Sequence, residues 1–357
     1  MLLSYVKVGH ICIYIVTLSL CYRVIESPRH QVATSQNLYQ ARPETNHPGA
    51  GMEFTTLGKT GLNVSRLGAG LGQLGGLPAD DVETAGRILG AALDGGVNFF
   101  DTGECYGNSE ELIGKAVAHR RDEIVLATKA GHGPTRSSGR PWIGETVADG
   151  IDRSLVRLKT DHVDLVQMHA DDISAPLPDD VMQAVLDAKE AGKTRFLGYS
   201  GENEDAEWAV QSGIFDTLQT SFNLLDQRAR YGLFEQARSR GIGIIGKRPI
   251  GQAMWGIAGG AGGGAGLSGT NVERFRRARA MLEMGPIDSA PQDDIVLALG
   301  FALAQEDVHT AIVGTGNLQH MLANIVAVES ALPIAEGVVA ELHRRFDLVG
   351  RDWPAIN

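Results

Sequence analysis

Four side chains that can donate, accept or stabilise a proton stand near the ends of apolar runs in the sequence. Three of these runs end at Asp101, Lys129 and His169, and Tyr106 follows Asp101 after a short glycine-containing segment. Continuous apolar runs are typical of parallel strands that are covered on both faces. When such strands close into a barrel, their carboxyl ends open at one mouth, where functional residues gather. We therefore expect an acid, a phenol, an ammonium and an imidazole to meet at one site.

This set of side chains suits the reduction of a carbonyl group, which needs a hydride at carbon and a proton at oxygen. A tyrosine with its ordinary pKa near 10 is a poor proton donor and acceptor at neutral pH. An ammonium beside the phenol favours the phenolate, and lowering the pKa to about 7 takes about 4 kcal/mol of differential stabilisation. We expect Lys129 to supply this and Asp101 to keep Lys129 charged. His169 would hydrogen-bond the substrate oxygen.

Each of these residues has a simpler explanation when it is considered alone. Asp101 could hydrogen-bond loop amides, Tyr106 could cover the end of the barrel, and Lys129 could belong to a structural ion pair. A single histidine such as His169 is more often a satisfied interior residue than a catalyst. The joint arrangement follows the order that one mechanism needs, which favours the catalytic interpretation.

The elements that would position these residues alternate from Met52 onward. Short runs rich in β-branched residues alternate with longer segments of helical periodicity, which indicates repeated βα units. The strands are predicted at 65–70, 97–102, 124–129, 163–169, 195–200, 217–222, 241–247 and 310–314. The helices are predicted at 81–94, 109–119, 145–158, 180–191, 204–212, 233–240, 293–305 and 318–328. This pattern predicts an α/β protein with a single (β/α)₈ TIM barrel.

Three further segments lie outside the repeat. Residues 53–64 place a Lys59-Thr60-Gly61 turn between two short alternating runs, which predicts a β-hairpin that plugs the bottom of the barrel. An extra C-terminal helix is predicted near 334–349. Residues 256–269 are almost entirely Gly and Ala, which predicts a mobile loop. Such a loop either folds over a cofactor or serves as an inert spacer.

Composition and charge narrow the classes of partner. The chain has 357 residues, of which 43% are hydrophobic and 21% charged, as is ordinary for a folded protein with a sizeable core. The formal net charge is -11 and the basic residues are dispersed, so we expect a small-molecule substrate and no nucleic acid. Only Cys105 among the cysteines lies in the predicted barrel, so we expect no disulfide framework, no metal and a cytoplasmic protein. The oligomeric state is left open.

The first 51 residues follow a different pattern. Residues 8–22 form an apolar run after Lys7, which is similar to a signal peptide or an anchor. No small-residue cleavage site follows Cys21, and the run is shorter than the ~20 residues of a membrane span. We interpret residues 1–51 as a non-globular extension that is either signal-like or upstream of a true start at Met52. Residues 52–350 would form the barrel domain, for which no membrane partner is expected.

The region around the four residues resembles the aldo/keto reductase family. Phe100-Asp101-Thr102 through Tyr106-Gly107 and Ser109-Glu110, followed by Lys129 and His169, is similar to the family's catalytic tetrad in order and approximate spacing. The likeness runs from Met52 to about Asn324 and includes Leu57-Gly-Lys-Thr-Gly-Leu-Asn-Val-Ser-Arg-Leu-Gly68. It implies one barrel that reduces a small aldehyde or ketone, or oxidises the corresponding alcohol or sugar. A nicotinamide cofactor would bind in an extended pose.

The resemblance also implies which residues bind the cofactor. Ser200 and Gln219 would contact the nicotinamide carboxamide. The turn formed by Lys247, Arg248 and Pro249 would lie beside the nicotinamide ring. A loop and the helix after it would hold the adenosine phosphate end through Gly314, Thr315, Gly316, His320 and Asn324.

Several positions depart from the family pattern. Gly201 stands where many members have asparagine, which removes one carboxamide contact, and Lys247 stands where many have an aromatic side chain. Gly314 and His320 replace the lysine and arginine that clamp the 2′-phosphate in members that prefer NADP. Family frequency favours NADPH, with NADH as the alternative.

A second nucleotide-binding pattern competes with this interpretation. Gly70-Leu-Gly72-Gln-Leu-Gly75 matches the dinucleotide fingerprint G-x-G-x-x-G, but so does a Gly-rich stretch at 264–269 in this chain with 45 glycines. The fingerprint requires a helix to open directly at the glycines, whereas Pro78 delays helical periodicity until about Asp81. A Rossmann fold is therefore disfavoured, although Gly72 and Gln73 could line the barrel mouth.

Two other functions stay open at this point. A barrel lyase or isomerase could use Lys129 as a Schiff-base nucleophile, with residues 314–316 gripping a substrate phosphate. Such an enzyme would not need Tyr106 so close to Asp101. A redox sensor that binds the nucleotide without significant turnover is the other alternative.

Overall fold

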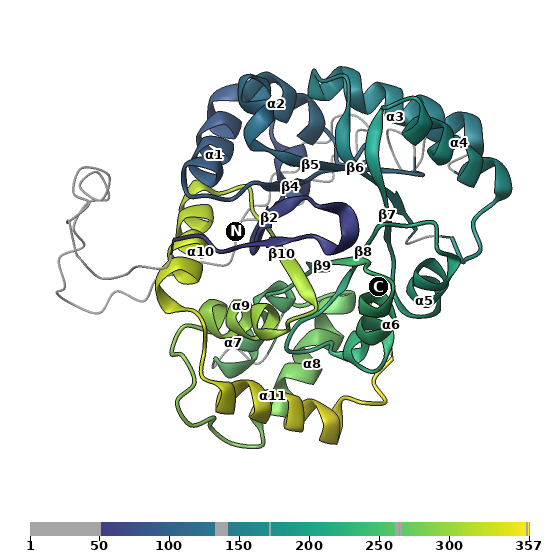
Figure 1. Cartoon of the computed structure of the whole chain (residues 1–357). Helices are drawn as coiled ribbons and strands as arrows, with labels where there is room; N and C mark the ends of the chain where they lie inside the picture. Colours follow the sequence, from purple (N-terminus) through teal and green to yellow (C-terminus); the bar gives the residue numbers. More distant parts are fainter. Residues whose placement is uncertain are drawn as a thin grey trace, which may run out of the picture. The chain divides into compact units, whose positions relative to one another are not determined.

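The computed structural model describes residues 51–132, 142–170, 173–260, 264, 266–354 and 356. Apart from Gly51, the predicted extension at 1–51 lies outside the described residues. Eight parallel strands close into a barrel in the order β10-β3-β4-β5-β6-β7-β8-β9, which confirms the predicted fold (Figure 1). The strands are β3 (Leu67–Gly70), β4 (Phe99–Asp101), β5 (Val125–Ala130), β6 (Val163–His169), β7 (Thr194–Ser200), β8 (Thr217–Ser221), β9 (Gly243–Lys247) and β10 (Val308–Gly314).

Helices surround the strands and bury apolar side chains against them (Figure 1). In α1 (Val82–Asp94), Ala85, Ile88 and Leu89 are buried, and Asp81 caps the helix by accepting a 3.2 Å hydrogen bond from the Thr84 amide. The other helices are α2 (Ser109–Ala116), α3 (Gly144–Leu158), α4 (Asp179–Glu190), α5 (Asn203–Ser212), α6 (Leu233–Ser239), α7 (Met254–Gly259), α8 (Thr270–Leu282), α9 (Asp294–Ala304), α10 (Leu318–Ala331) and α11 (Glu336–Val349).

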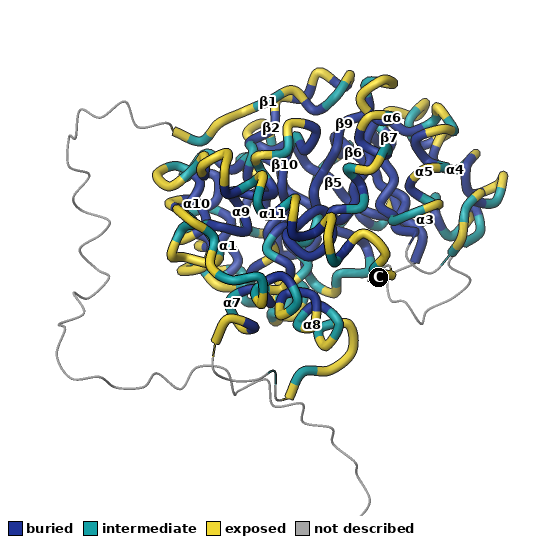
Figure 2. Tube along the Cα trace, turned by 90° about the horizontal axis from the view of Figure 1, so that it is seen from below, coloured by how far each residue is buried: buried dark blue, intermediate teal, exposed yellow. Residues whose placement is uncertain are grey.

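A hairpin covers the amino end of the barrel, as predicted. Strands β1 (Phe54–Thr56) and β2 (Asn63–Ser65) pair antiparallel, and the hairpin lies across the barrel end that faces the viewer in Figure 1. Leu57, Leu62 and Val64 of this hairpin are buried in one cluster with apolar side chains from the inner faces of the strands. A larger cluster fills the layer between the strands and the helices, so buried chain fills the interior in Figure 2. The hairpin therefore closes one end of the barrel with a packed plug.

The segment between β9 and β10 differs most from the prediction. The predicted mobile loop at 256–269 is wrong at its start, because Gly256 belongs to α7, where Met254 and Trp255 are buried. A Cβ at Gly256 would lie 2.5 Å from Asp294 Oδ2, so the glycine permits close packing of α7 on α9. Residues 261–263 and 265 of this loop lie outside the described residues.

Helix α8 was not predicted because two of its buried positions are arginines. The Arg277 side chain is fully buried, and it donates hydrogen bonds to Glu273 (2.9 Å), to the Leu225 carbonyl (3.2 Å) and to the Pro354 carbonyl. These acceptors pair with the buried guanidinium and so offset the cost of its burial. In a sequence pattern, arginine at these positions indicates a solvent-facing residue, so the apolar periodicity of α8 is hidden.

Within the described residues, no single helix is long and apolar enough to cross a bilayer. The adjoining helices α10 and α11 meet that test only as a pair, by length and composition, and they are bent by 115° relative to each other.

Candidate active site

A cavity of about 380 Å³ lies at the carboxyl ends of the barrel strands. Most of the predicted site residues line it: Asp101, Tyr106, His169, Ser200, Gln219, Lys247, Arg248, Pro249 and Gly314. Gly72 and Gln73 also line it, as the sequence suggested. The glycines around Gly72 form a 3-10 turn, η3 (Gly72–Gly76), and α1 begins only at Val82. The local structure therefore lacks the strand-to-helix turn of a dinucleotide fingerprint.

An ion pair lies beneath Tyr106 at the floor of the cavity. Asp101 is the last residue of β4, and Lys129 lies on the neighbouring strand β5. The Lys129 ammonium contacts Asp101 Oδ2 and donates a 3.0 Å hydrogen bond to the Thr102 carbonyl. The same nitrogen lies 4.9 Å from the centre of the Tyr106 ring. The structure thus brings the phenol and the ammonium together, as the sequence predicted.

Burial and charge act in opposite directions on this group of residues. Burial raises the pKa of Tyr106 above its ordinary value, and this effect exceeds the opposing influence of Lys129. Burial also opposes the charge on Lys129, but Asp101 and Tyr106 outweigh it and raise the pKa of the amine. The expected net lowering of the Tyr106 pKa is therefore wrong in this structure, because the phenol is too deeply buried for one ammonium to compensate. The lysine stays charged and the phenol stays protonated at neutral pH.

His169 approaches the phenol from the other side. It is the last residue of β6, and its ring meets that of Tyr106 edge to face, with 5.7 Å between the ring centres. Cys105 Sγ lies 3.4 Å from His169 Nδ1, and the ring of His132 packs on His169 at 4.7 Å. No sequence motif indicates a role for Cys105 or His132. Both contact the imidazole that would orient a substrate oxygen.

Two glutamine amides hold the other oxygen of Asp101. Gln167 Nε2 and Gln219 Nε2 each donate a 2.8 Å hydrogen bond to Asp101 Oδ1. Gln219 Oε1 accepts a hydrogen bond of 3.1 Å from Ser200 Oγ. Gln167 was not among the predicted site residues. Its position offered a signal, since residues two apart on a strand face the same side of the sheet. It precedes His169 by two positions on β6 and so faces the barrel interior.

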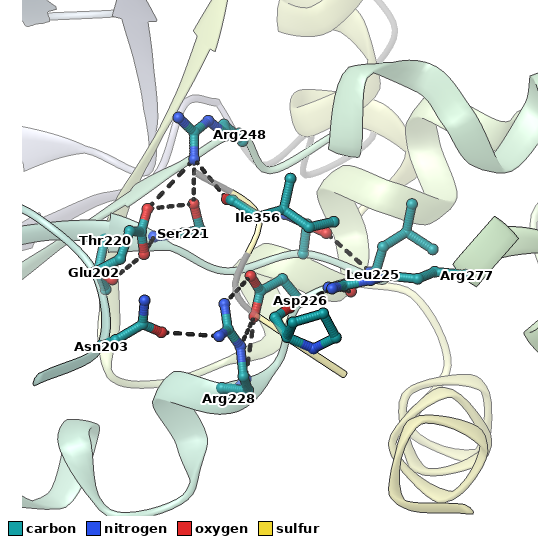
Figure 3. A network of polar contacts seen from close by, with 12 residues as sticks. Glu202, Asn203, Thr220, Ser221, Leu225, Asp226, Arg228, Arg248, Arg277 and Ile356 are labelled. Carbon is teal, nitrogen blue, oxygen red and sulfur yellow. Dashed lines mark hydrogen bonds and ion pairs between the residues drawn. The ribbon is translucent and has the colours of Figure 1, made fainter. Parts of the chain in front are cut away.

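A carboxylate whose side chain is only 12% exposed, that of Glu202, organises the turn after β9 (Figure 3). Glu202 accepts hydrogen bonds from Thr220 Oγ1 (2.9 Å) and Ser221 Oγ (2.7 Å), and it pairs with Lys247 at 3.2 Å and Arg248 at 3.4 Å. Burial opposes its charge, but Lys247, Ser221 and Arg248 outweigh this and hold the pKa of Glu202 below its ordinary value. Nothing in the sequence around Glu202 indicates this role, because its partners come from the following two strands.

The turn after β9 also has unusual backbone geometry. Arg248, Gln252 and Ala253 all have positive φ, at 57°, 60° and 57°. Such conformations are uncommon outside glycine and cluster at functional sites. Both Arg248 and Gln252 line the cavity. The backbone therefore supports a binding role for this turn.

The remaining predicted cofactor residues follow Gly314 along the chain, outside the lining of the cavity. Thr315 Oγ1 accepts a 3.0 Å hydrogen bond from the Asn317 amide, and Asn317 caps α10. On this helix His320 is exposed and Asn324 is buried. Gly316 lies between Thr315 and the cap. These residues form a loop and helix start at the end of β10, next in the barrel to β3.

Comparison with known proteins agrees with this geometry. The chain belongs to the aldo/keto reductase family, whose model matches residues 66–342. It is 31% identical over 314 residues to the uncharacterized oxidoreductase YrpG of Bacillus subtilis, covering 79% of this chain and 92% of the relative. It is 28% identical over 300 residues to L-galactose dehydrogenase of Arabidopsis thaliana, covering 78% and 88%.

A solved structure shows the same fold. The holo form of aldo-keto reductase AKR11C1 from Bacillus halodurans superposes with a TM-score of 0.67 at 26% identity, covering 82% of this chain and 96% of that one. The protein is therefore an NAD(P)H-dependent oxidoreductase of carbonyl groups.

The residues at the cavity fit a nicotinamide dinucleotide. Lys247 and Arg248 line its wall, in the turn that the family resemblance places beside the nicotinamide ring. A Cβ at Gly72 would lie 3.6 Å from the Tyr106 ring, so the glycine leaves space beside the phenol. Ser200 Oγ and the Gln219 amide provide the polar groups that a carboxamide needs.

Proposed function

We propose that this chain reduces a small aldehyde or ketone with NADPH, and that Tyr106 is the general acid. The observation that carries this proposal is the Lys129 ammonium, held by Asp101 and lying 4.9 Å from the ring of Tyr106 at the cavity floor. A protonated phenol beside a fixed positive charge can give up its proton to a carbonyl oxygen, because the ammonium stabilises the phenolate left behind.

The residues divide the remaining work. When bound, the nicotinamide supplies the hydride. His169 donates a hydrogen bond to the carbonyl oxygen and directs it towards the Tyr106 hydroxyl. Tyr106 transfers its proton to that oxygen, and Lys129 offsets the charge that develops on the phenol. In the oxidation of an alcohol, the phenolate accepts the proton instead.

The cofactor and substrate preferences are proposals that rest on fewer contacts. Gly314 and His320 are exposed where a lysine and an arginine would grip a 2′-phosphate, so we expect a weaker preference for NADPH over NADH than those two cations would give. The substrate is proposed to be a small carbonyl compound, and the relative named L-galactose dehydrogenase adds sugars to the panel worth testing.

The chemistry of Lys129 speaks against a Schiff-base lyase. Only a neutral amine attacks a carbonyl, and neighbouring Asp101 and Tyr106 raise the pKa of Lys129. Borohydride in the presence of a carbonyl substrate should therefore trap no adduct on Lys129, as peptide mass spectrometry would show.

The test of the reductase proposal is the change Tyr106→Phe. Protein fluorescence should report NADPH and NADH affinities close to those of the unchanged protein, whereas turnover of an aldehyde panel should fall at least about a hundredfold. Tyr199→Phe is the matched control, because Tyr199 is buried on β7 and its hydroxyl has no hydrogen-bond partner among the described residues. Full turnover by the Tyr106→Phe protein would refute the proposal. Nucleotide binding without turnover in the unchanged protein would favour the sensor.

A further inference from the structure

The two carboxylate oxygens of Asp101 have different partners. Oδ2 contacts the Lys129 ammonium, whereas Oδ1 accepts 2.8 Å hydrogen bonds from the amide nitrogens of Gln167 and Gln219. All four side chains are buried. Both oxygens of the Asp101 carboxylate are therefore held in place, and the orientation of this carboxylate determines the position of the Lys129 ammonium.

The two glutamines are not equivalent. Gln219 lines the cavity, and its Oε1 accepts a hydrogen bond from Ser200 Oγ. A ligand amide that enters the cavity therefore competes for the hydrogen bonds of Gln219. Gln167 is fully buried beneath the cavity, and its Oε1 accepts a 3.2 Å hydrogen bond from Gln219 Nε2. Only Gln167 can therefore hold Asp101 without being disturbed by what the cavity binds.

The barrel provides space for this side chain. A Cβ at Gly198 on the next strand would lie 2.9 Å from Gln167 Cγ and 2.5 Å from Thr217 Oγ1. Glycine at position 198 thus leaves room for a long amide in the barrel interior, where Leu165 two residues earlier joins the apolar cluster below. A buried amide in such a layer is costly unless each polar atom is paired, and here both are.

We propose that Gln167 is a positioning residue, whose amide fixes Asp101 so that the Lys129 charge stays beneath the Tyr106 phenol. This inference rests on the proposed function. Two effects act in the same direction when the amide is lost. The carboxylate gains freedom to move away with the lysine, and its negative charge is no longer offset by the amide dipole. Both effects make it harder to form a phenolate at Tyr106.

The first test is Gln167→Met, which keeps the length of the side chain and removes the donor. The Tyr106 resonance is assigned in protein labelled with ¹³C at the tyrosine ring, by its absence from Tyr106→Phe, and is titrated without nucleotide. We expect the midpoint to move upward. The turnover number should fall about tenfold, the loss expected for one hydrogen bond to a charged group. NADPH affinity should stay within about twofold, whereas Gln219→Met should weaken it.

The second test is Gln167→Glu, which remains informative if Gln167→Met fails to fold. A protonated Glu at this position donates to Asp101, whereas an ionised one repels it. We expect near-normal turnover at acidic pH and a loss as pH rises through the neutral range, where the turnover of the unchanged protein should stay level. An unmoved Tyr106 titration in Gln167→Met, or a flat pH profile in Gln167→Glu, would overturn the proposal. Since the titration needs no turnover, it separates this failure from failure of the reductase mechanism.

Discussion

Tyr106 is influenced by burial and by a neighbouring cation, and burial has the larger effect on its pKa. In the proposed mechanism of carbonyl reduction, the reactive form of Tyr106 is the protonated phenol. We therefore expect the reduction rate to stay level through neutral pH and to fall only above the ordinary tyrosine pKa of about 10. Oxidation of the corresponding alcohol needs the phenolate, so its rate should rise over the same alkaline range. Steady-state pH profiles in both directions check this.

Removing the charge of Lys129 should shift the alkaline pH range of alcohol oxidation to still higher pH. Lys129 lowers the pKa of Tyr106, so Lys129→Met is expected to shift the rise in alcohol oxidation to still higher pH. The change also leaves Asp101 buried without its cation, which costs about 3–5 kcal/mol of stability. Urea unfolding measures that loss. An alkaline profile that does not move would contradict the assigned role of Lys129.

At the residue scale, the sequence predicted the four side chains that we propose carry the reaction, but it did not predict Gln167, which helps to hold Asp101. Asp101, Tyr106, Lys129 and His169 follow strand ends, where chemistry is expected. Gln167 has no reactive group, and its importance depends on where Asp101 lies in three dimensions. The direction of the change in the Tyr106 pKa could not be predicted either, because the sequence does not show how deeply the phenol is buried.

At the scale of elements, Glu202 joins the ends of three consecutive strands. Its folded-state pKa is lowered, so its contribution to stability is present above the unfolded-state pKa and is lost as pH falls through the folded-state value. We expect Glu202→Gln to cost about 3 kcal/mol at neutral pH, because Lys247, whose side chain is only 13% exposed, would lose its carboxylate partner. That difference should shrink below about pH 4. Unfolding by urea at several pH values tests this, and a constant difference would contradict it.

The hairpin that closes the barrel offers a second test at this scale. Gly58 has φ of +51°, and a Cβ there would lie 2.3 Å from the Gly243 amide nitrogen. Gly61 has φ of +72° but faces open space, so it is a matched control. Gly61→Ala should cost about 1 kcal/mol, whereas Gly58→Ala should cost clearly more because backbone must also move. Denaturant unfolding compares them, and equal losses would show that packing at Gly58 is unimportant.

The elements themselves were predictable where their periodicity was regular. All eight strands and the hairpin occur where the apolar pattern indicated, with ends displaced by a residue or two. Helices α7 and α8 were missed for separate reasons. In α7, glycine allows close helix packing, whereas glycine-rich composition usually indicates a loop. In α8, buried arginines interrupt the apolar stripe that would indicate a helix.

At the scale of the whole molecule, the C-terminal residues connect distant parts of the fold (Figure 3). Arg248 donates to the Ile356 carbonyl at 3.4 Å, and Arg277 donates to the Pro354 carbonyl. A chain that ends at Asp352 should therefore bind NADPH several-fold more weakly, because Arg248 loses one of the groups that orient it. Fluorescence titration measures this. Leu348→Ser is the control, because Leu348 is 64% exposed.

The packed hairpin has a kinetic consequence. Among the described residues, Leu57, Leu62 and Val64 pack across the amino end of the barrel, and the cavity opens at the carboxyl end of the strands. Whatever binds deepest must enter first and leave last. We therefore expect an ordered sequence in which nucleotide precedes carbonyl compound and the alcohol departs before the oxidised nucleotide, and product-inhibition patterns would reveal that order.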